Sequence, residues 1–244
     1  DDYCTAVIAQ TYDIFGSIGY WYTTWAGQFV NWLIKGIAGN VGIGMTMLLP
    51  GFVLATLFGA LSWALHEIAL VLRLRRPWFA GLLLAALLVY AITDSAPNTY
   101  QSFYWTGAII PYTAPLILFA LFVGFLIRTL RRSDRISPTV LIVSFGIAFW
   151  GGGLSEVYVT FQTAAFLLGA IICLLVVPRH VKPLAMAMLG AGIVGSLLAM
   201  GIILAAPGNA VRSSFFPPSP SPFTATRAKA RAPRRWRISR RAQC

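Results

Sequence analysis

Apolar residues in this chain form long runs, separated by short polar or turn-forming connections. A helix needs about 20 consecutive, mostly apolar residues to cross the hydrocarbon core of a bilayer. The pattern therefore predicts an all-α fold, a polytopic transmembrane helix bundle with an amphipathic loop domain on its outer face. We expect about six spans, at residues 46–72, 78–93, 109–127, 138–151, 160–177 and 184–206.

Residues 1–45 show a different pattern, because acids, amides and glycines interrupt their apolar content. No window in this segment is apolar for long enough to cross a membrane. Trp25, Phe29 and Trp32 recur at helical spacing, which indicates a short helix lying in the membrane interface. We expect residues 1–45 to form an outer-face loop and interfacial-helix region, and residues 46–206 to form the transmembrane bundle.

Composition excludes a soluble domain, since 58% of the residues are hydrophobic and only 11% are charged. The net charge of +12 does not indicate a nucleic-acid partner, because most of it lies beyond Arg212 in a tail with eight basic residues and no acid. Residues 207–244 are expected to begin as an outer loop and continue as a disordered Pro/Arg-rich tail. Two explanations of this tail stay open, a native basic segment and a non-native terminus.

Basic residues occupy every second connection between the predicted spans. The intervening connections contain none, apart from Lys35 before the first span and Arg212 after the last. By the positive-inside rule, the basic connections are cytoplasmic and the others face outward. We therefore expect an integral membrane protein with an extracytoplasmic active face. The basic connections contain Arg73, Arg75, Arg76, Arg128, Arg131, Arg132, Arg135, Arg179 and Lys182.

Aromatic residues gather in the predicted outer connections, where two polar-aromatic stretches occur. One contains Trp25 and Gln28, and the other contains Tyr104 and Trp105. Two interpretations are open. Tyr and Trp favour membrane interfaces in general, but the predicted inner face carries few of them, which favours a cleft. Aromatic faces beside carboxylates and amides suit the rings of sugars.

Asp1 and Asp2 form a paired carboxylate in a predicted outer segment. Like charges this close raise the pKa of one of the two groups, which suits a general base or a shared metal ion. A divalent cation, Mg²⁺ or Mn²⁺, is the metal such carboxylates would hold. The alternative is a solvated acid pair with no chemical role.

Two further charged residues stand at the ends of predicted spans. Glu156 follows three glycines, which permit close approach of a ligand, and Gln162 lies six residues further on. Arg212 follows the turn residues around Asn209 and is well situated for a lipid phosphate. The alternatives are a helix-capping or interfacial acid for Glu156 and ordinary head-group anchoring for Arg212.

These pieces together resemble an uncharacterised family of bacterial multi-pass membrane proteins grouped near the GT-C superfamily of polytopic glycosyltransferases. The resemblance covers residues 1–212. It rests on short stretches in a shared order and on the same predicted face, not on one specific motif. The stretches are 1–3, 24–29, 103–107 with 111–112, 152–156 and 206–212.

The resemblance implies a protein of a bacterial inner (plasma) membrane, in contact with membrane lipids. It also implies transfer of a sugar from a polyprenyl-phosphate-linked donor to an extracytoplasmic glycan acceptor. It implies Asp1 or Asp2 as general base or metal ligand, Arg212 as the cation for the leaving phosphate and Glu156 as a partner of sugar hydroxyls. Gln28 stands where relatives often have arginine, and the chain begins as a fragment would, so activity of the fragment alone is in question. The alternatives are a transporter or flippase for a lipid-linked or polar substrate, and a non-catalytic assembly subunit.

Overall fold

The computed structural model describes residues 2–132 and 135–215, which form helices and connections only. This confirms the predicted all-α fold class. The helices in chain order are α1 (Asp2–Thr24), α2 (Phe29–Val41), α3 (Ile43–Val71), α4 (Pro77–Asp94), the π-helical η1 (Tyr100–Tyr104), α5 (Thr106–Ala108), the π-helical η2 (Ile109–Thr113), α6 (Ala114–Arg132), α7 (Pro138–Gly152), α8 (Glu156–Val176), α9 (Lys182–Leu204) and α10 (Gly208–Ser214).

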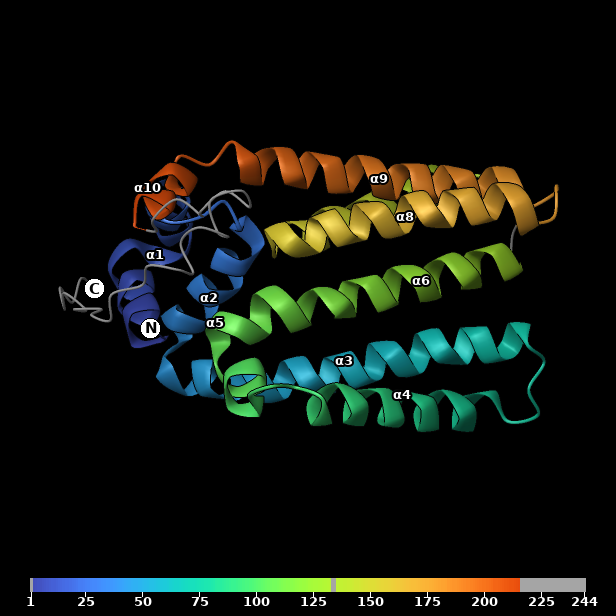
Figure 1. Ribbon diagram of the computed structural model, residues 1–244, viewed down its shortest axis with the longest axis horizontal. Coiled ribbons are helices and arrows are strands. Elements are labelled where there is room, and N and C mark those ends of the chain that lie inside the picture. Colours follow the sequence, from blue (N-terminus) through green and yellow to red (C-terminus); the bar gives the residue numbers. More distant parts are fainter. Residues whose placement is uncertain (1, 133–134, 216–244) are drawn as a thin grey trace, which may run out of the picture.

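The long helices α3, α4, α6, α7, α8 and α9 run side by side along the longest axis of the molecule (Figure 1). Five stretches, which are α3, α4, α8, α9 and the continuous Thr106–Arg132 segment, are long and apolar enough to cross a membrane, and α7 is a shorter apolar helix. A helix satisfies its own backbone hydrogen bonds, which a chain in lipid requires. The chain is therefore an integral membrane protein. Five of the six segments predicted as spans fall on these helices, and the sixth, 138–151, falls on the shorter α7.

The connections between the helices lie at two opposite ends of the bundle. The turns after α3, α6 and α8 lie at one end, which we call the basic end because it carries the arginines of residues 73–76, 128–135 and 179 (Figure 1). Helices α1, α2, α5 and α10 lie at the other end, which we call the cap end. The basic connections, which alternate with non-basic ones along the sequence, thus gather at one end of the bundle.

The N-terminal segment is more regular than its polar residues predicted. Helices α1 and α2 form a hairpin that packs at the cap end (Figure 1). A Cβ on Gly39 would lie 2.8 Å from Cβ of Ala9, and Asn40 Nδ2 donates to the Ala9 carbonyl over 2.8 Å. Small residues thus let the two helices approach closely, while polar side chains bond across them. Trp25 lies in the turn before α2, so it does not share a helix with Phe29 and Trp32.

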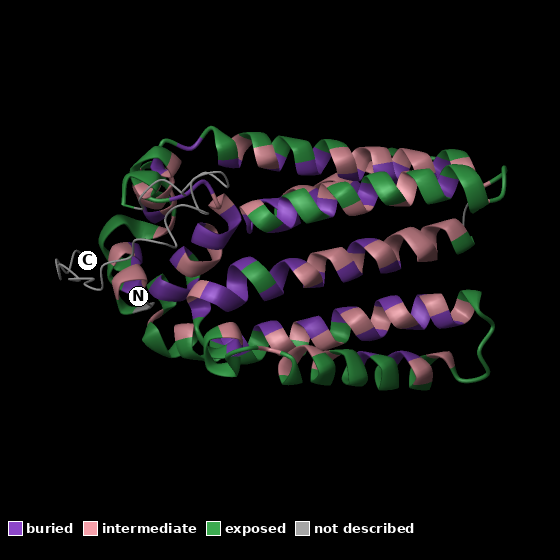
Figure 2. Ribbon diagram, viewed as in Figure 1, coloured by how far each residue is buried: buried purple, intermediate pink, exposed green. Residues whose placement is uncertain are grey.

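The bundle has two three-helix groups, α3–α4–α6 and α7–α8–α9, and α6 contacts α7 between them. The largest buried apolar cluster joins α2, α3, η2, α6 and the turn after α7, and it includes Leu57, Ile109 and Leu154. Figure 2 shows exposed residues along α4 and α8, and consecutive leucines of α4 (Leu82–Leu84) are exposed. Such apolar surface is stable only against lipid tails, in agreement with a membrane location.

The last described segment is short. Residues predicted as the start of an outer loop form α10 at the cap end, next to α1. The tail at residues 216–244 lies outside the described residues, and its predicted disorder stays a prediction.

Candidate functional site

Glu156 begins α8, directly after the tight turn at residues 153–155. This turn and Gly152, the last residue of α7, pack against α2 and α9. A Cβ on Gly153 would overlap the Phe29 ring at 2.5 Å, and the Gly153 carbonyl accepts from Val30 N over 3.1 Å. A Cβ on Gly152 would lie 2.9 Å from Cβ of Ala199. The glycines therefore allow three helices to meet, and this contact places Glu156 at the cap end.

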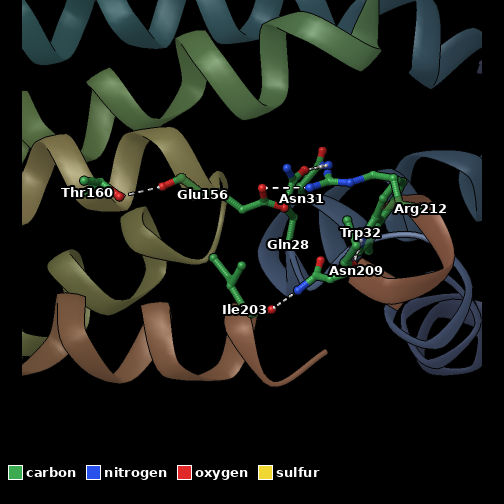
Figure 3. A network of polar contacts seen from close by, with 9 residues as sticks. Gln28, Asn31, Trp32, Glu156, Thr160, Ile203, Asn209 and Arg212 are labelled. Carbon is green, nitrogen blue, oxygen red and sulfur yellow. Dashed lines mark hydrogen bonds and ion pairs between the residues drawn. The ribbon is translucent and has the colours of Figure 1, made fainter. Parts of the chain in front are cut away.

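Arg212 lies on α10 and reaches Glu156 across the top of the bundle. Its Nη2 donates to Glu156 Oε2 over 2.9 Å, and the two side chains are 30% and 32% exposed. The pair joins α10 to α8 although 56 residues separate them in sequence. Both residues were predicted on one membrane face, and the structure brings them into direct contact (Figure 3).

A cavity of about 300 Å³ lies beside this ion pair. We call it the α8–α10 cavity. Its volume is at the lower end of the range for pockets that bind small molecules. The polar side is formed by Glu156, Thr160, Asn209 and Arg212, and the apolar side by Val159, Met200, Ile203 and Leu204. Asn209 is thus the third predicted site residue that the structure assembles here.

Hydrogen-bond acceptors without a partner surround the ion pair. Among the described residues, the buried oxygens Glu156 Oε1, Asn209 Oδ1 and Asn31 Oδ1 have no donor. The amide nitrogens are used, since Asn209 Nδ2 donates to the Ile203 carbonyl over 2.7 Å and Asn31 Nδ2 donates to Gln28 Oε1 over 2.9 Å. Leaving a buried acceptor unpaired costs about 1–3 kcal/mol. These three acceptors are buried, so a hydroxyl donor of a ligand reaches them only if side chains around the ion pair move.

Gln28 and Asn31 project from the start of α2 toward the Glu156–Arg212 pair (Figure 3). Gln28 was a predicted site residue, whereas Asn31 was not. The available signal was spacing, because residues three apart share one face of a helix. Thr160, which lines the cavity, was also missed, although it lies one turn after Glu156 on α8.

Gln162 is not part of this cavity. Its side chain is buried inside the bundle, where Nε2 donates to the Ala148 carbonyl over 2.8 Å and to Ser196 Oγ over 2.6 Å. It thereby connects α8 to α7 and α9. Gln162 lies six residues after Glu156 on the same helix. Its side chain therefore points toward the neighbouring helices and not toward the cavity.

The predicted aromatic residues do not gather in one cleft. The backbone of Trp25 packs against Gly208, and its ring lies 6.3 Å from that of Phe215. Tyr104 stacks on Tyr100 at 6.1 Å, and the Trp105 ring lies against Gly107. Figure 1 shows α5 on the side of α3 and α4, whereas α10 lies on the side of α9. Tyr104 and Trp105 therefore belong to a surface separate from the α8–α10 cavity.

The predicted catalytic pair lies at the edge of the description. Asp1 is outside the described residues, and Asp2 is described only as the first residue of α1, a cap-end helix. Their roles as base or metal ligands stay predictions. Within residues 3–132 and 135–215, no three His, Cys, Asp or Glu side chains come together as a metal site would require.

Comparisons of the chain with protein-family models, with curated proteins and with solved structures gave no significant match.

Proposed function

We propose that this chain is a membrane-embedded, GT-C-like glycosyltransferase that binds a polyprenyl-phosphate-linked sugar in the α8–α10 cavity. The observation that carries the proposal is the Glu156–Arg212 ion pair on the wall of a 300 Å³ cavity at the end of membrane-spanning helices. By the positive-inside rule this end is extracytoplasmic. The acceptor is then a glycan of the cell envelope.

Each part of such a donor has a counterpart in the cavity. Arg212 supplies a guanidinium, which binds phosphate oxygens with two parallel hydrogen bonds. On binding, the Glu156 and Asn209 side chains turn their unpaired, buried oxygens toward the cavity and accept from sugar hydroxyls. The prenyl chain follows the apolar wall to Leu204, the last residue of α9, which is 71% exposed. A lipid-linked sugar is the ligand class that needs all three surfaces at once.

The resemblance assigns transfer to the N-terminal acids. The residues that follow them, Thr5 and Ala6, lie beside Thr46 and Thr106 and not at the α8–α10 cavity, so this step requires the acids to approach the bound donor. The carboxylate of Asp1 or Asp2 takes the proton of an acceptor hydroxyl, whose oxygen bonds to the anomeric carbon of the sugar. The bond from that carbon to the phosphate oxygen breaks, and polyprenyl phosphate leaves with the electron pair. Arg212 stabilises the developing phosphate charge, as cations do at phosphoryl leaving groups. A Mg²⁺ or Mn²⁺ ion on the two carboxylates is the alternative role for them.

The test measures donor binding and transfer separately, in the full-length protein reconstituted in lipid nanodiscs with a radiolabelled polyprenyl-phosphate sugar. Arg212→Gln is expected to weaken donor binding by about tenfold or more, since a hydrogen bond to a charged group contributes about 1.5–3 kcal/mol. Asp1→Asn with Asp2→Asn is expected to abolish transfer and leave binding unchanged. Arg75→Gln, at the basic end, removes the same charge and serves as the matched control.

Two results would contradict the proposal. If Arg212→Gln binds the donor with parental affinity, the α8–α10 cavity is not the donor-binding site. Movement of the donor across the bilayer without transfer, at the same rate in the Asp1/Asp2 double variant, would establish a flippase instead.

A further inference from the structure

A buried acid lies at the opposite end of the molecule from the α8–α10 cavity. Glu67 is on α3, about one turn before that helix ends, and its side chain is 1% exposed. Its carboxylate accepts from Arg128 Nη1 over 3.2 Å and from Arg131 Nη2 over 2.7 Å. Both arginines come from the last turns of α6, so one carboxylate holds two guanidinium groups.

The register of α3 and α6 produces this arrangement. Both helices run from the cap end to the basic end (Figure 1). A Cβ on Gly124 would lie 2.7 Å from the Trp63 ring and 3.1 Å from Cα of Ala64, so the two backbones are close at this level. Glu67 follows Trp63 by one turn, and Arg128 follows Gly124 by one turn. Arg131 lies on the same face, because residues three apart are neighbours on a helix.

The arginines keep most of their binding capacity. A guanidinium has five N–H donors, and each of the two side chains donates one hydrogen bond to Glu67. Arg128 and Arg131 are 39% and 32% exposed, whereas the carboxylate that holds them is fully buried. Among the described residues, two positive charges contact one negative charge. Both arginines lie in the last turns of α6, where this spanning helix ends.

We propose that Arg128 and Arg131, oriented by Glu67, form a binding site for the phosphate group of an anionic phospholipid at the basic end. Lipid phosphates lie at the ends of spanning helices, and basic sites between such helices suit anionic head groups. Planar guanidinium groups bind phosphate with two parallel hydrogen bonds, and holding two of them in place lowers the entropy lost on binding. This site is independent of the proposed sugar transfer.

Orientation by Glu67 distinguishes this site from diffuse attraction between a basic surface and an anionic membrane. Arg73, Arg75 and Arg76 supply diffuse attraction without any buried acid. In the diffuse case, Glu67→Gln removes a negative charge and strengthens binding of anionic lipid. In the oriented site, the same change frees the two guanidinium groups and weakens binding. The two explanations therefore predict opposite signs for one substitution.

The experiment measures retention of phosphatidylglycerol relative to phosphatidylcholine on the purified full chain, by native mass spectrometry from mixed-lipid nanodiscs. Glu67→Gln is expected to reduce the preference for phosphatidylglycerol about tenfold, the effect of leaving two side chains to be immobilised on binding. The double variant Arg128→Lys with Arg131→Lys keeps the charge but loses the planar guanidinium groups. It is expected to reduce the preference for phosphatidylglycerol by a similar factor. Arg75→Lys with Arg76→Lys is the matched control and is expected to retain it.

Unchanged or stronger preference in Glu67→Gln, or in the double lysine variant at positions 128 and 131, would overturn the proposal. The lysine variant decides the matter if Glu67→Gln does not fold. An excess of inorganic phosphate is expected to leave phosphatidylglycerol bound. If inorganic phosphate displaces phosphatidylglycerol from the parent but not from the lysine variant, the site binds free phosphate. That result would overturn the assignment to a lipid.

Discussion

Two glutamates of this chain pair with arginine, and their surroundings give them different capacities. Glu67 is buried and has both carboxylate oxygens bonded, one to Arg128 and one to Arg131. Glu156 is one-third exposed, bonds Arg212 through Oε2 and keeps Oε1 without a donor beside a cavity. A carboxylate whose two oxygens are both bonded orients its partners. A carboxylate with one unpaired oxygen can also accept a hydrogen bond from a ligand. The residue type is the same, and the number of unpaired oxygens separates the two roles.

Gln162 allows a test of the difference between helix packing and ligand binding at the scale of one residue. Gln162→Leu is expected to lower the free energy of unfolding by about 1 kcal/mol, because interhelical hydrogen bonds in membranes contribute roughly that much. Donor binding at the α8–α10 cavity should stay at the parental level. Thermal unfolding in detergent and the donor-binding assay measure the two quantities.

Thr163→Val is the matched control for Gln162→Leu, because the Thr163 hydroxyl donates within its own helix, to the Val159 carbonyl. We expect a smaller loss of stability in this control. If Gln162→Leu instead loses donor binding while its stability is unchanged, Gln162 contributes to the donor-binding site.

At the scale of elements, the cavity depends on the short helix α10. A helix of 7 residues is not stable in isolation, so its position must come from packing. Gly208, its first residue, lies against the α1–α2 turn, where a Cβ would be 2.6 Å from the Trp25 nitrogen and 2.8 Å from the Tyr22 carbonyl oxygen. This close contact sets where Arg212, one turn further on, meets Glu156.

Gly208→Ala is therefore expected to displace α10 and to weaken donor binding by about tenfold, comparable to the loss of one hydrogen bond to a charged group. The bundle should keep its helical content, measured by circular dichroism. Gly201→Ala is the matched control, because no atom lies within 4 Å of a Cβ at that position. Equal donor affinity in the parent and Gly208→Ala would argue against a role of α10 in the cavity.

At the scale of the whole molecule, charge is distributed between two ends of a bundle. The basic end carries the arginine-rich connections, and the cap end carries the α8–α10 cavity. In the orientation proposed above from the positive-inside rule, these ends face opposite sides of the bilayer and the basic connections lie in the cytoplasm. The α8–α10 cavity and the lipid site at Arg128 and Arg131 would then serve different leaflets.

This orientation predicts the labelling of single cysteines in a chain whose own cysteines have been replaced. Asn98→Cys, between α4 and η1, should react with a membrane-impermeant maleimide in intact cells. Leu74→Cys, between α3 and α4, should react only after the membrane is permeabilised. Both positions are exposed in the structure, so a difference in labelling reports the side of the membrane. The reverse pattern would invert the proposed orientation.

The sequence by itself determined the fold class, the approximate spans and the separation of basic from non-basic connections. These properties follow from uninterrupted apolar runs and from arginine positions, which depend on neighbours in the chain alone. It also assigned Glu156, Asn209 and Arg212 to one face. Residues 1–45 were harder, because Gly39 and Asn40 interrupt an apolar pattern but serve to pack α2 on α1.

Only the tertiary structure decided which of the predicted residues meet. It joined Glu156 to Arg212, brought Asn31 and Thr160 to the site, turned Gln162 into the bundle and separated Tyr104 from the cavity. It also paired Glu67 with two arginines of α6. These outcomes depend on helix register and on close backbone approach at glycines, which are properties of pairs of helices. Hydrophobic pattern specifies that a helix crosses the membrane, but its rotation and neighbours follow from packing.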